Sequence, residues 1–196
     1  MEAKQTSLHL GNQDSIQNQP PAIFFRPFES SRTDFDAVMD FGSDQHVNRT
    51  LQFDLFTGRD DAVRFIETII LPHPWFRFIC LSDATDDRPI GSIVLRPENA
   101  GGGRRRVSIG YSVVPELWGK GIATVAVRMA VAAAFEQWPE VERVQALVFL
   151  NNPASQRVLE KAGFQKEGVL RKYLVSKGEL IDVAMYSFIA ADCRAF

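Results

Sequence analysis

A glycine-containing junction at Pro115–Thr124 constrains the fold of this chain more than any other segment. Apolar residues alternate before it, over Val107–Val113, as in a half-buried strand, and a long apolar run typical of a buried helix follows it. The first N–H groups of a helix have no partner within the helix, and the helix dipole adds about half a positive charge there. Gly119 and Gly121 permit a close approach to the backbone, and Lys120 adds a full charge. The junction therefore predicts a binding site for a pyrophosphate.

The two glycines of the junction are also compatible with a tight strand-to-helix turn that binds no ligand. Two nucleotide-binding motifs fit the junction poorly. A phosphate-binding P-loop requires Gly-x-x-x-x-Gly-Lys followed by Ser or Thr, and this spacing is absent. A dinucleotide fingerprint requires a third small residue after Gly119 and Gly121, where this chain has Thr124. The junction by itself leaves two interpretations open, a pyrophosphate cradle of another kind and a tight turn that binds no ligand.

The composition is that of an ordinary globular protein of 196 residues with a net charge of −2. Such a charge gives no reason to expect binding to nucleic acid or to a membrane surface. Cys80 and Cys193 are too few for a disulfide framework, and Cys80 lies in an apolar stretch that predicts a buried thiol. We expect a cytoplasmic protein, because unpaired thiols suit a reducing compartment.

The N-terminal segment differs from the rest of the chain. Residues 1–20 are rich in Gln, Asn and Ser and lack an apolar stretch, which predicts a disordered tail rather than a signal peptide. Residues 21–196 are expected to form one domain.

Periodicity and turn residues predict a mixed order of strands and helices, in which hairpins dominate. The expected strands are Ile23–Pro27, Phe76–Ser82, Pro89–Leu95, Arg105–Val114, Val144–Leu150, Gln165–Val175 and Leu180–Ala190. The expected helices are Ser31–Phe41, Arg59–Leu71, Ile122–Trp138 and a helix from Asn152 to Gly163. Residues Gly42–Thr57 show no clear pattern.

A second informative segment begins at Asn152. An Asn before Pro153 is a typical helix N-cap, and Gly163 is a typical residue just beyond a helix end. This structural account explains most of the segment. It leaves Ser155 and Arg157, both near the helix start, without an explanation.

Taken together, the two segments resemble the GNAT superfamily of acetyl-coenzyme-A-dependent N-acyltransferases, and within it the RimJ/RimL type that acetylates ribosomal proteins. The resemblance covers residues 22–190 and rests on Ile109-Gly110-Tyr111, Trp118–Thr124, Asn152–Ser155 and Leu159–Phe164. It implies an α/β (mixed α+β) fold with a central, mostly antiparallel seven-stranded sheet. It also implies a splay between the fourth and fifth strands and about four flanking helices.

The resemblance also implies where acetyl-CoA, the co-substrate, binds. The pantetheine arm would pair with the strand before the junction, the pyrophosphate would lie on the amides of the junction, and Asn152 would contact the pantetheine region. The implied coenzyme-binding residues are Ser112, Val113, Val114, Trp118, Gly119, Lys120, Gly121, Ile122, Ala123, Thr124, Asn152 and Ser155. No metal is implied.

In the implied mechanism an amine attacks the thioester carbonyl directly. Amides near the splay, of Val113 or Val114, polarise that carbonyl, and Ser155 protonates the leaving thiolate. For the general base the sequence offers Glu116, Tyr173, Asp182 and His46, with a chain of waters as an equal alternative. Ser155, Tyr173 and Glu116 are the catalytic residues we predict.

The acceptor is the least constrained part of the prediction. At physiological pH a lysine amine, with a pKa of about 10.4, is neutral in only about 0.1% of molecules. An α-amine, with a pKa of about 7.8, is neutral in about one third of them. An N-terminal α-amine of a protein therefore asks less of a base, and the resemblance to the RimJ/RimL type makes it the favoured acceptor. One alternative is a small amine: a polyamine, an amino acid or an aminoglycoside-like compound. An acidic pocket for a polyamine would come from Asp34, Asp36, Asp40, Asp44 and Asp54. The other alternative is a non-catalytic acyl-CoA-binding module. The oligomeric state is not predicted.

Overall fold

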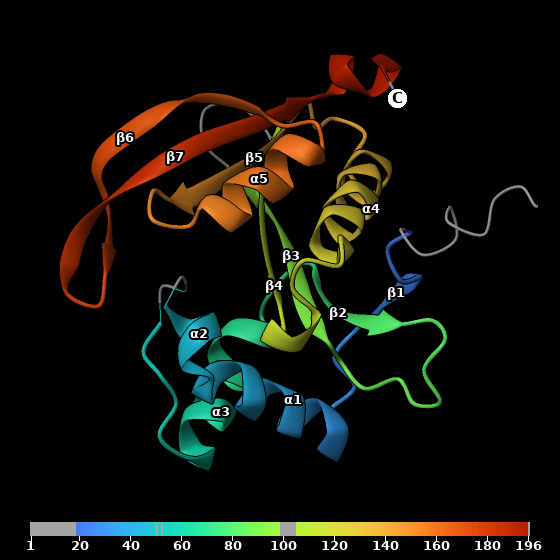
Figure 1. Cartoon of the computed structure of the whole chain (residues 1–196), viewed down its shortest axis with the longest axis vertical. Helices are drawn as coiled ribbons and strands as arrows, with labels where there is room; N and C mark the ends of the chain where they lie inside the picture. Colours follow the sequence, from blue (N-terminus) through green and yellow to red (C-terminus); the bar gives the residue numbers. More distant parts are fainter. Residues whose placement is uncertain (1–18, 50, 52, 99–104, 196) are drawn as a thin grey trace, which may run out of the picture.

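The computed structural model describes residues 19–49, 51, 53–98 and 105–195, so residues 1–18 of the predicted tail lie outside it, and the predicted domain start at residue 21 stays a prediction. The described residues form one seven-stranded sheet in the order β1-β2-β3-β4-β5-β7-β6 (Figure 1). Neighbouring strands are antiparallel except for β4 and β5, as predicted. The strands are β1 (Ile23–Arg26), β2 (Phe76–Leu81), β3 (Gly91–Glu98), β4 (Arg106–Val113), β5 (Arg143–Phe149), β6 (Gln165–Ser176) and β7 (Glu179–Ile189).

The α-helices of the described residues agree with the predicted ones, with one addition. They are α1 (Arg32–Ser43), α2 (Gln45–Asn48), α3 (Arg59–Phe65), α4 (Ile122–Gln137) and α5 (Pro153–Lys161). The π- and 3₁₀-helical turns are η1 (Ile66–Ile70), η2 (Pro115–Leu117) and η3 (Ala190–Ala195). The added helix, α2, lies in the stretch without a clear pattern and begins where the Asp44 carboxylate caps it. The predicted helix at Arg59–Leu71 ends in a π-helical turn, in which Leu71 N–H donates to the Ile66 carbonyl.

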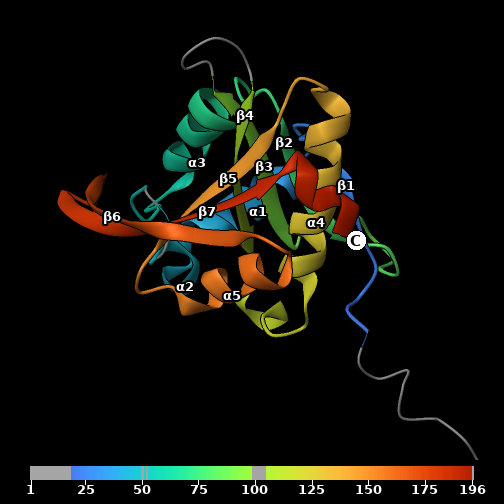
Figure 2. The ribbon, with the colours of Figure 1, turned by 90° about the horizontal axis from the view of Figure 1, so that it is seen from above.

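Two hydrophobic clusters cover opposite faces of the sheet. In β4 the side chains of Val107, Ile109 and Val113 point into the larger cluster, which packs against α4 and α5. The smaller cluster lies between the first strands and helices α1 and α3. Figures 1 and 2 show these two groups of helices on their respective sides of the sheet. The alternation seen in the sequence thus places the end of β4 and the start of α4 beside the larger core.

A buried ion pair joins β1 to α1. The Arg26 Nη2 donates to Asp34 Oδ1 at 2.6 Å, and the Glu29 N–H donates to Asp34 Oδ2 at 2.7 Å. The Asp34 side chain is 0% exposed and that of Arg26 8%. Hydrogen bonding and the charge of Asp34 raise the pKa of Arg26. Because buried charges are costly unless they are paired, this contact fixes how α1 lies on the sheet.

Strands β4 and β5 pair over only a short length. Their register covers Arg106–Arg143, Val107–Val144 and Ser108–Gln145, and the strands diverge beyond it. The rest of β4, up to Val113, therefore borders β5 without pairing to it. This divergence is the predicted splay, and it opens at the end of the sheet where the carboxyl ends of both parallel strands lie.

The paired end of these strands is crossed by a row of polar side chains. Gln145 Nε2 donates to Glu98 Oε1 at 2.8 Å, Arg143 binds both carboxylate oxygens of Glu167 at 2.6 Å, and Ser187 Oγ donates to the same carboxylate. The hydrogen bonds from Arg143 and Ser187 lower the pKa of Glu167 to about 2. We call these five side chains the polar row; it links strands from β3 to β6.

The β6–β7 hairpin projects from the sheet and reaches α2 with its tip (Figures 1 and 2). Lys177 Nζ donates to the carbonyl and to Oδ1 of Asn48, at 2.9 and 2.6 Å. Asn48 is buried, and its amide nitrogen donates to the Phe53 carbonyl. The β6–β7 turn is therefore tied to the end of α2, a segment 129 residues earlier in the chain.

Both cysteines are free, as the sequence predicts. Cys80 is buried and its thiol donates to the Asp87 carbonyl, whereas Cys193 is exposed. Burial raises the pKa of the Cys80 thiol. In the described part of the chain no helix is both long and apolar enough to cross a membrane.

Candidate functional site

The junction predicted to bind pyrophosphate folds as a turn with two left-handed residues. Gly119 and Gly121 have φ of +78° and +81°, a region that favours glycine. A β-carbon added at Gly119 would meet nothing within 4 Å, whereas one at Gly121 would lie 3.1 Å from Pro20. Lys120 is exposed between them. The turn therefore presents backbone toward open space.

Helix α4 begins without a side-chain cap. In α1 and α5 the N-cap side chains of Ser31 and Asn152 accept a backbone N–H from the first turn. The N-cap of α4 is Gly121, which has no side chain to do so. The first backbone bond into this helix start is donated by Val125 to the Gly121 carbonyl, so the preceding amides of Ile122–Thr124 have no helical acceptor. This helix start is thus chemically ready for an anion.

Trp118 lies at the entrance to this turn. The residue is 52% exposed, and its indole Nε1 donates to the Val113 carbonyl at 2.7 Å. Its backbone N–H donates to the Pro115 carbonyl within η2. The Trp118 amide is therefore already used, and the amides available to an anion lie after it.

The backbone of β4 presents different residues to its two neighbours. Val114 N–H donates to the Ile90 carbonyl beside β3, and the Val114 carbonyl accepts from Leu117. Because successive residues of a strand direct their N–H groups to opposite sides, Val113 N–H points away from β3, toward the splay. Of the two amides predicted to polarise a carbonyl, the Val114 amide is committed and that of Val113 is suitably directed. Ser112 faces β3, where its hydroxyl bonds that of Ser92 at 3.0 Å.

Ser155 and Asn152 lie across the splay from β4. Asn152 Oδ1 accepts the Ser155 N–H at 3.0 Å, which is the predicted N-cap. Tyr111, two residues before Val113 on β4, places its hydroxyl 2.8 Å from Ser155 Oγ and 3.1 Å from the Ser155 carbonyl. Burial raises the pKa of Tyr111 well above its ordinary value, although the hydrogen bond to Ser155 opposes this. The sequence pattern had assigned no role to the Tyr111 hydroxyl.

A signal for this tyrosine exists in the sequence. Tyr111 occupies a core-facing position of an alternating strand, and a buried tyrosine hydroxyl requires a hydrogen-bonding partner. The partner, 44 residues later in the chain, could not be named from the pattern.

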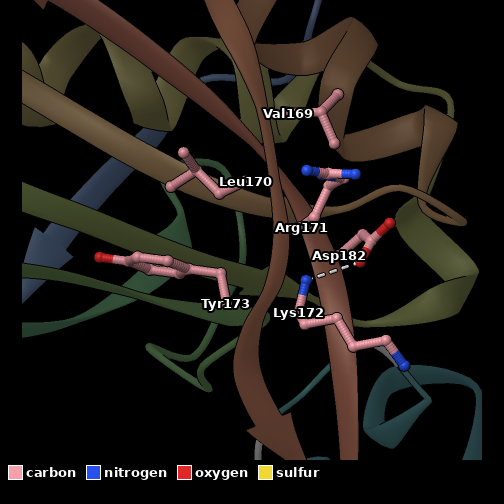
Figure 3. Close-up of a pocket in the computed structure, with 6 residues that line it drawn as sticks. All are labelled: Val169, Leu170, Arg171, Lys172, Tyr173 and Asp182. Atoms are coloured by element: carbon pink, nitrogen blue, oxygen red, sulfur yellow. Dashed lines mark hydrogen bonds between the residues drawn. The ribbon is translucent and has the colours of Figure 1, made fainter.

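A surface cavity of about 590 Å³ lies on the β6–β7 hairpin (Figure 3). The register shifts between Leu170 and Leu174, and Lys172 within this bulge has φ of +50°. Asp182 Oδ1 accepts the Lys172 N–H at 2.7 Å and so holds the bulge. The cavity is lined by Val169, Leu170, Arg171, Lys172, Tyr173 and Asp182.

The sheet register places this cavity at the end of the sheet where the splay opens, on strands β7 and β6 that follow β5. Val183, next to Asp182, pairs with Phe149 at the carboxyl end of β5. In Figure 3 Tyr173 extends from one side of the hairpin, and Arg171 and Asp182 extend from the other. Tyr173 is 54% exposed. Of these two candidate bases, Asp182 therefore shares the side of the hairpin on which Arg171 lies, and Tyr173 does not.

Three other residues that the sequence singled out have no described contact with Ser155 or with the cavity. Glu116 is exposed in η2, and no hydrogen bond or ion pair of the described residues involves it. His46 is exposed beside Asp44. Arg157, which the sequence left without an explanation, is exposed and pairs with Glu160 on the solvent side of α5.

The acidic cluster predicted as an alternative polyamine pocket is largely occupied by other contacts. Asp34 is buried against Arg26, Asp36 pairs with Arg32, Asp40 pairs with Arg88, and Asp44 caps α2. These carboxylates therefore do not form a shared anionic pocket. In the described residues, no group of three or more His, Cys, Asp or Glu side chains is arranged to hold a metal ion.

Comparison with known proteins agrees with this geometry. The family model of the acetyltransferase (GNAT) domain matches residues 23–165. The uncharacterized N-acetyltransferase p20 of Bacillus licheniformis is 32% identical over 164 residues, which cover 81% of this chain and 89% of p20. YoaA, an uncharacterized N-acetyltransferase of Bacillus subtilis, is 42% identical over 85 residues, or 43% of this chain and 48% of YoaA. The putative ribosomal N-acetyltransferase YdaF of Bacillus subtilis is 38% identical over 45% of this chain and 48% of YdaF.

Solved structures show the same fold. RimJ of Mycobacterium smegmatis, in complex with CoA-disulfide, superposes with a TM-score of 0.70 at 26% identity, covering 89% of this chain and 86% of RimJ. A spermidine N-acetyltransferase of Vibrio cholerae, in complex with CoA and spermine, gives a TM-score of 0.68 at 19% identity, over 86% and 96% of the chains.

Proposed function

Because this chain belongs to the GNAT family of acetyltransferases, and is thus an acetyl-CoA-dependent N-acetyltransferase, we propose that its acceptor is the N-terminal α-amine of a protein. The observation that carries this proposal is the charge of the cavity on the β6–β7 hairpin, at the end of the sheet where the splay opens. The cavity is lined by two cationic side chains, Arg171 and Lys172, and a single carboxylate, Asp182. A relative, YdaF, bears the name of a putative ribosomal N-acetyltransferase, which supports a protein acceptor.

The residues of the junction fit a coenzyme pyrophosphate. The open space at Gly119 leaves room for a ligand, and the amides of Ile122–Thr124 are directed outward at the start of α4. We assign the pyrophosphate to the amides from Gly119 to Thr124, with Lys120 as the nearby charge. The pantetheine arm then lies along the unpaired part of β4 at Val113, toward Asn152.

Acetyl-CoA supplies an acetyl group activated as a thioester. Val113 N–H, directed into the splay, donates a hydrogen bond to the thioester carbonyl as negative charge develops on its oxygen. Ser155 Oγ, held at the opposite side of the splay by Asn152 and Tyr111, donates its proton to the departing sulfur. These two groups act on the two ends of the bond that breaks.

The acceptor amine must be neutral to react, and this requirement favours an α-amine. None of the candidate bases is placed beside Ser155 by a described contact. An α-amine is deprotonated about 300 times more often than a lysine amine at neutral pH, a difference of about 3.4 kcal/mol. An acceptor of this kind proceeds with a weak base or a water.

The charges of the site disfavour a polyamine. A polycation needs several free carboxylates, and the acidic residues near α1 are engaged by arginines or by a helix cap. The cavity itself has more positive than negative side chains. A small amine with one charge, such as an amino acid, is the second candidate class.

The test is thiol release from acetyl-CoA with a panel of acceptors. The panel contains peptides with a free N-terminus and different first residues, the same peptides with a blocked N-terminus and an internal lysine, spermidine, and free amino acids. Gly121→Glu serves as the coenzyme-binding control. We expect turnover only with free N-terminal peptides, and a ranking by first residue.

Each of the remaining outcomes identifies a different function. Turnover confined to spermidine or amino acids would reject a protein acceptor. Binding of acetyl-CoA in calorimetry without turnover of any amine would identify a non-catalytic acyl-CoA-binding module.

A further inference from the structure

The contact between Tyr111 and Ser155 contains more acceptors than protons. Tyr111 Oη lies 3.1 Å from the Ser155 carbonyl, which can only accept, and 2.8 Å from Ser155 Oγ, which can donate or accept. A tyrosine hydroxyl has one proton. When Tyr111 donates to the carbonyl, Ser155 must donate to Tyr111. When Tyr111 donates to Ser155 Oγ, the Ser155 proton is released for another acceptor.

The surroundings keep Tyr111 protonated in both arrangements. Burial raises the pKa of its hydroxyl, so the phenol stays neutral across the physiological range. The Ser155 backbone is fixed independently, because its N–H donates to Asn152 Oδ1. The freedom of this pair is therefore confined to the direction of two O–H bonds.

We propose that Tyr111 is a positioning residue that sets the direction in which the Ser155 hydroxyl donates, from Tyr111 in the resting site to the sulfur of the thioester during transfer. The inference rests on the proposed function, since it gives Ser155 a proton to deliver. It assigns a role to a tyrosine of β4 that lies across the splay from α5.

The proton balance of the step involves no ionisation of Tyr111. The acceptor nitrogen forms its bond to the acetyl carbon, the carbon–sulfur bond breaks, and its electron pair goes to sulfur. Ser155 gives its proton to the sulfur, while the Tyr111 O–H turns from the Ser155 carbonyl to Ser155 Oγ. The proton lost by the nitrogen passes through solvent to Ser155 in the same step, so Ser155 is not left as an alkoxide and the starting arrangement is restored.

A purely mechanical role for Tyr111 is the competing hypothesis. Its hydroxyl joins β4 to α5 where the strands have already diverged, and removing it would then loosen the coenzyme site. The chain offers a matched control, a second buried tyrosine whose hydroxyl joins a strand to α5. Tyr186 of β7 is 0% exposed and also reaches α5, with its hydroxyl 3.3 Å from Gln156 and Glu160.

The experiment measures kcat with the best acceptor, acetyl-CoA affinity by calorimetry and the melting temperature. The variants are Tyr111→Phe, Ser155→Ala, the double variant, and Tyr186→Phe as the control. General-acid catalysis of this kind contributes about 10²-fold or more, so Ser155→Ala should lower kcat by about that factor. Tyr111→Phe should lower kcat about three- to tenfold, the size of one net neutral hydrogen bond, with acetyl-CoA affinity unchanged.

The double variant distinguishes the proposed role of Tyr111, directing the Ser155 hydroxyl, from a purely mechanical role. We expect its kcat to equal that of Ser155→Ala, because without the Ser155 hydroxyl Tyr111 has nothing to direct, and Tyr186→Phe should keep the wild-type kcat. Multiplying effects, or a loss of coenzyme affinity in Tyr111→Phe, would overturn the proposal. Wild-type turnover by Ser155→Ala would also overturn it while leaving the acetyltransferase function intact. An inactive wild type would instead reject the proposed function.

Discussion

Substituting Gly121 tests the pyrophosphate cradle by charge alone when two side chains of the same shape are compared. Gly121 caps α4 with φ of +81° and ψ of −4°, and it has no side chain of its own to occupy the helix amides. Gly121→Glu and Gly121→Gln introduce side chains of nearly equal size. Both impose the same left-handed strain, about 1–2 kcal/mol for a residue with a β-carbon, and the same approach to Pro20.

The difference between the two variants is therefore electrostatic. A carboxylate about 6 Å from one phosphate charge costs about 0.7 kcal/mol at the dielectric constant of water and about 2.8 kcal/mol at an effective value of 20. We expect Gly121→Glu to bind acetyl-CoA about 3 to 100 times more weakly than Gly121→Gln. Since the screening length falls from about 10 Å at 0.1 M salt to about 3 Å at 1 M, the gap should narrow as salt is added.

Calorimetric titration with acetyl-CoA at low and high salt measures this gap. Circular dichroism melting of both variants checks that they are equally folded. Equal affinities of the Glu and Gln variants at low salt would refute the reasoning, because a pyrophosphate at this helix start must sense the added charge.

Three further predictions concern stability, coenzyme binding and pH. Asp34→Asn should lower the free energy of unfolding by about 3–5 kcal/mol by leaving a buried cation unpaired, whereas exposed Asp36→Asn should change it by about 0.5 kcal/mol or less; similar urea midpoints would contradict this. Acetyl-CoA should change the tryptophan emission, because the Trp118 indole bonds the Val113 carbonyl beside the pantetheine path, and an unchanged response in Trp118→Phe would assign the signal elsewhere. Burial lowers the pKa of His73 to about 4, so the folded protein holds it neutral where the unfolded chain is already protonated. The free energy of unfolding should therefore be independent of His73 above about pH 6.5 and fall as the pH is lowered toward 4; an NMR titration midpoint near 6.5 would disprove it.

Features that depend on neighbouring residues were predictable. Asn152, Pro153 and Gly163 mark both ends of α5, because capping and termination are decided within one helical turn. The alternation in β4 identified its core-facing side, since the side-chain period of a strand is two residues. The uncapped start of α4 followed from the glycines, whereas the splay came only from the family resemblance.

Features that depend on distant residues were not predictable. Lys172 takes a left-handed conformation because the carboxylate of Asp182, on the next strand, accepts its N–H. No local preference of lysine favours this conformation, so nothing near Lys172 in the sequence indicates the bulge. The partner of Tyr111 lies 44 residues away, and that of Lys177 lies 129 residues away. Such contacts require the order of the strands to be known first.

The polar row has a mechanical consequence for the sheet. A V-shaped opening concentrates stress at its apex, and here the apex lies where β4 and β5 pair at only three positions. The bond from Gln145 on β5 to Glu98 on β3 crosses this apex, and the bidentate pair of Arg143 with Glu167 ties β5 to β6 beside it. A ligand that binds between the diverging parts of β4 and β5 would therefore bend the two halves of the sheet about this apex. It would not separate the residues of β4 and β5 that are already paired.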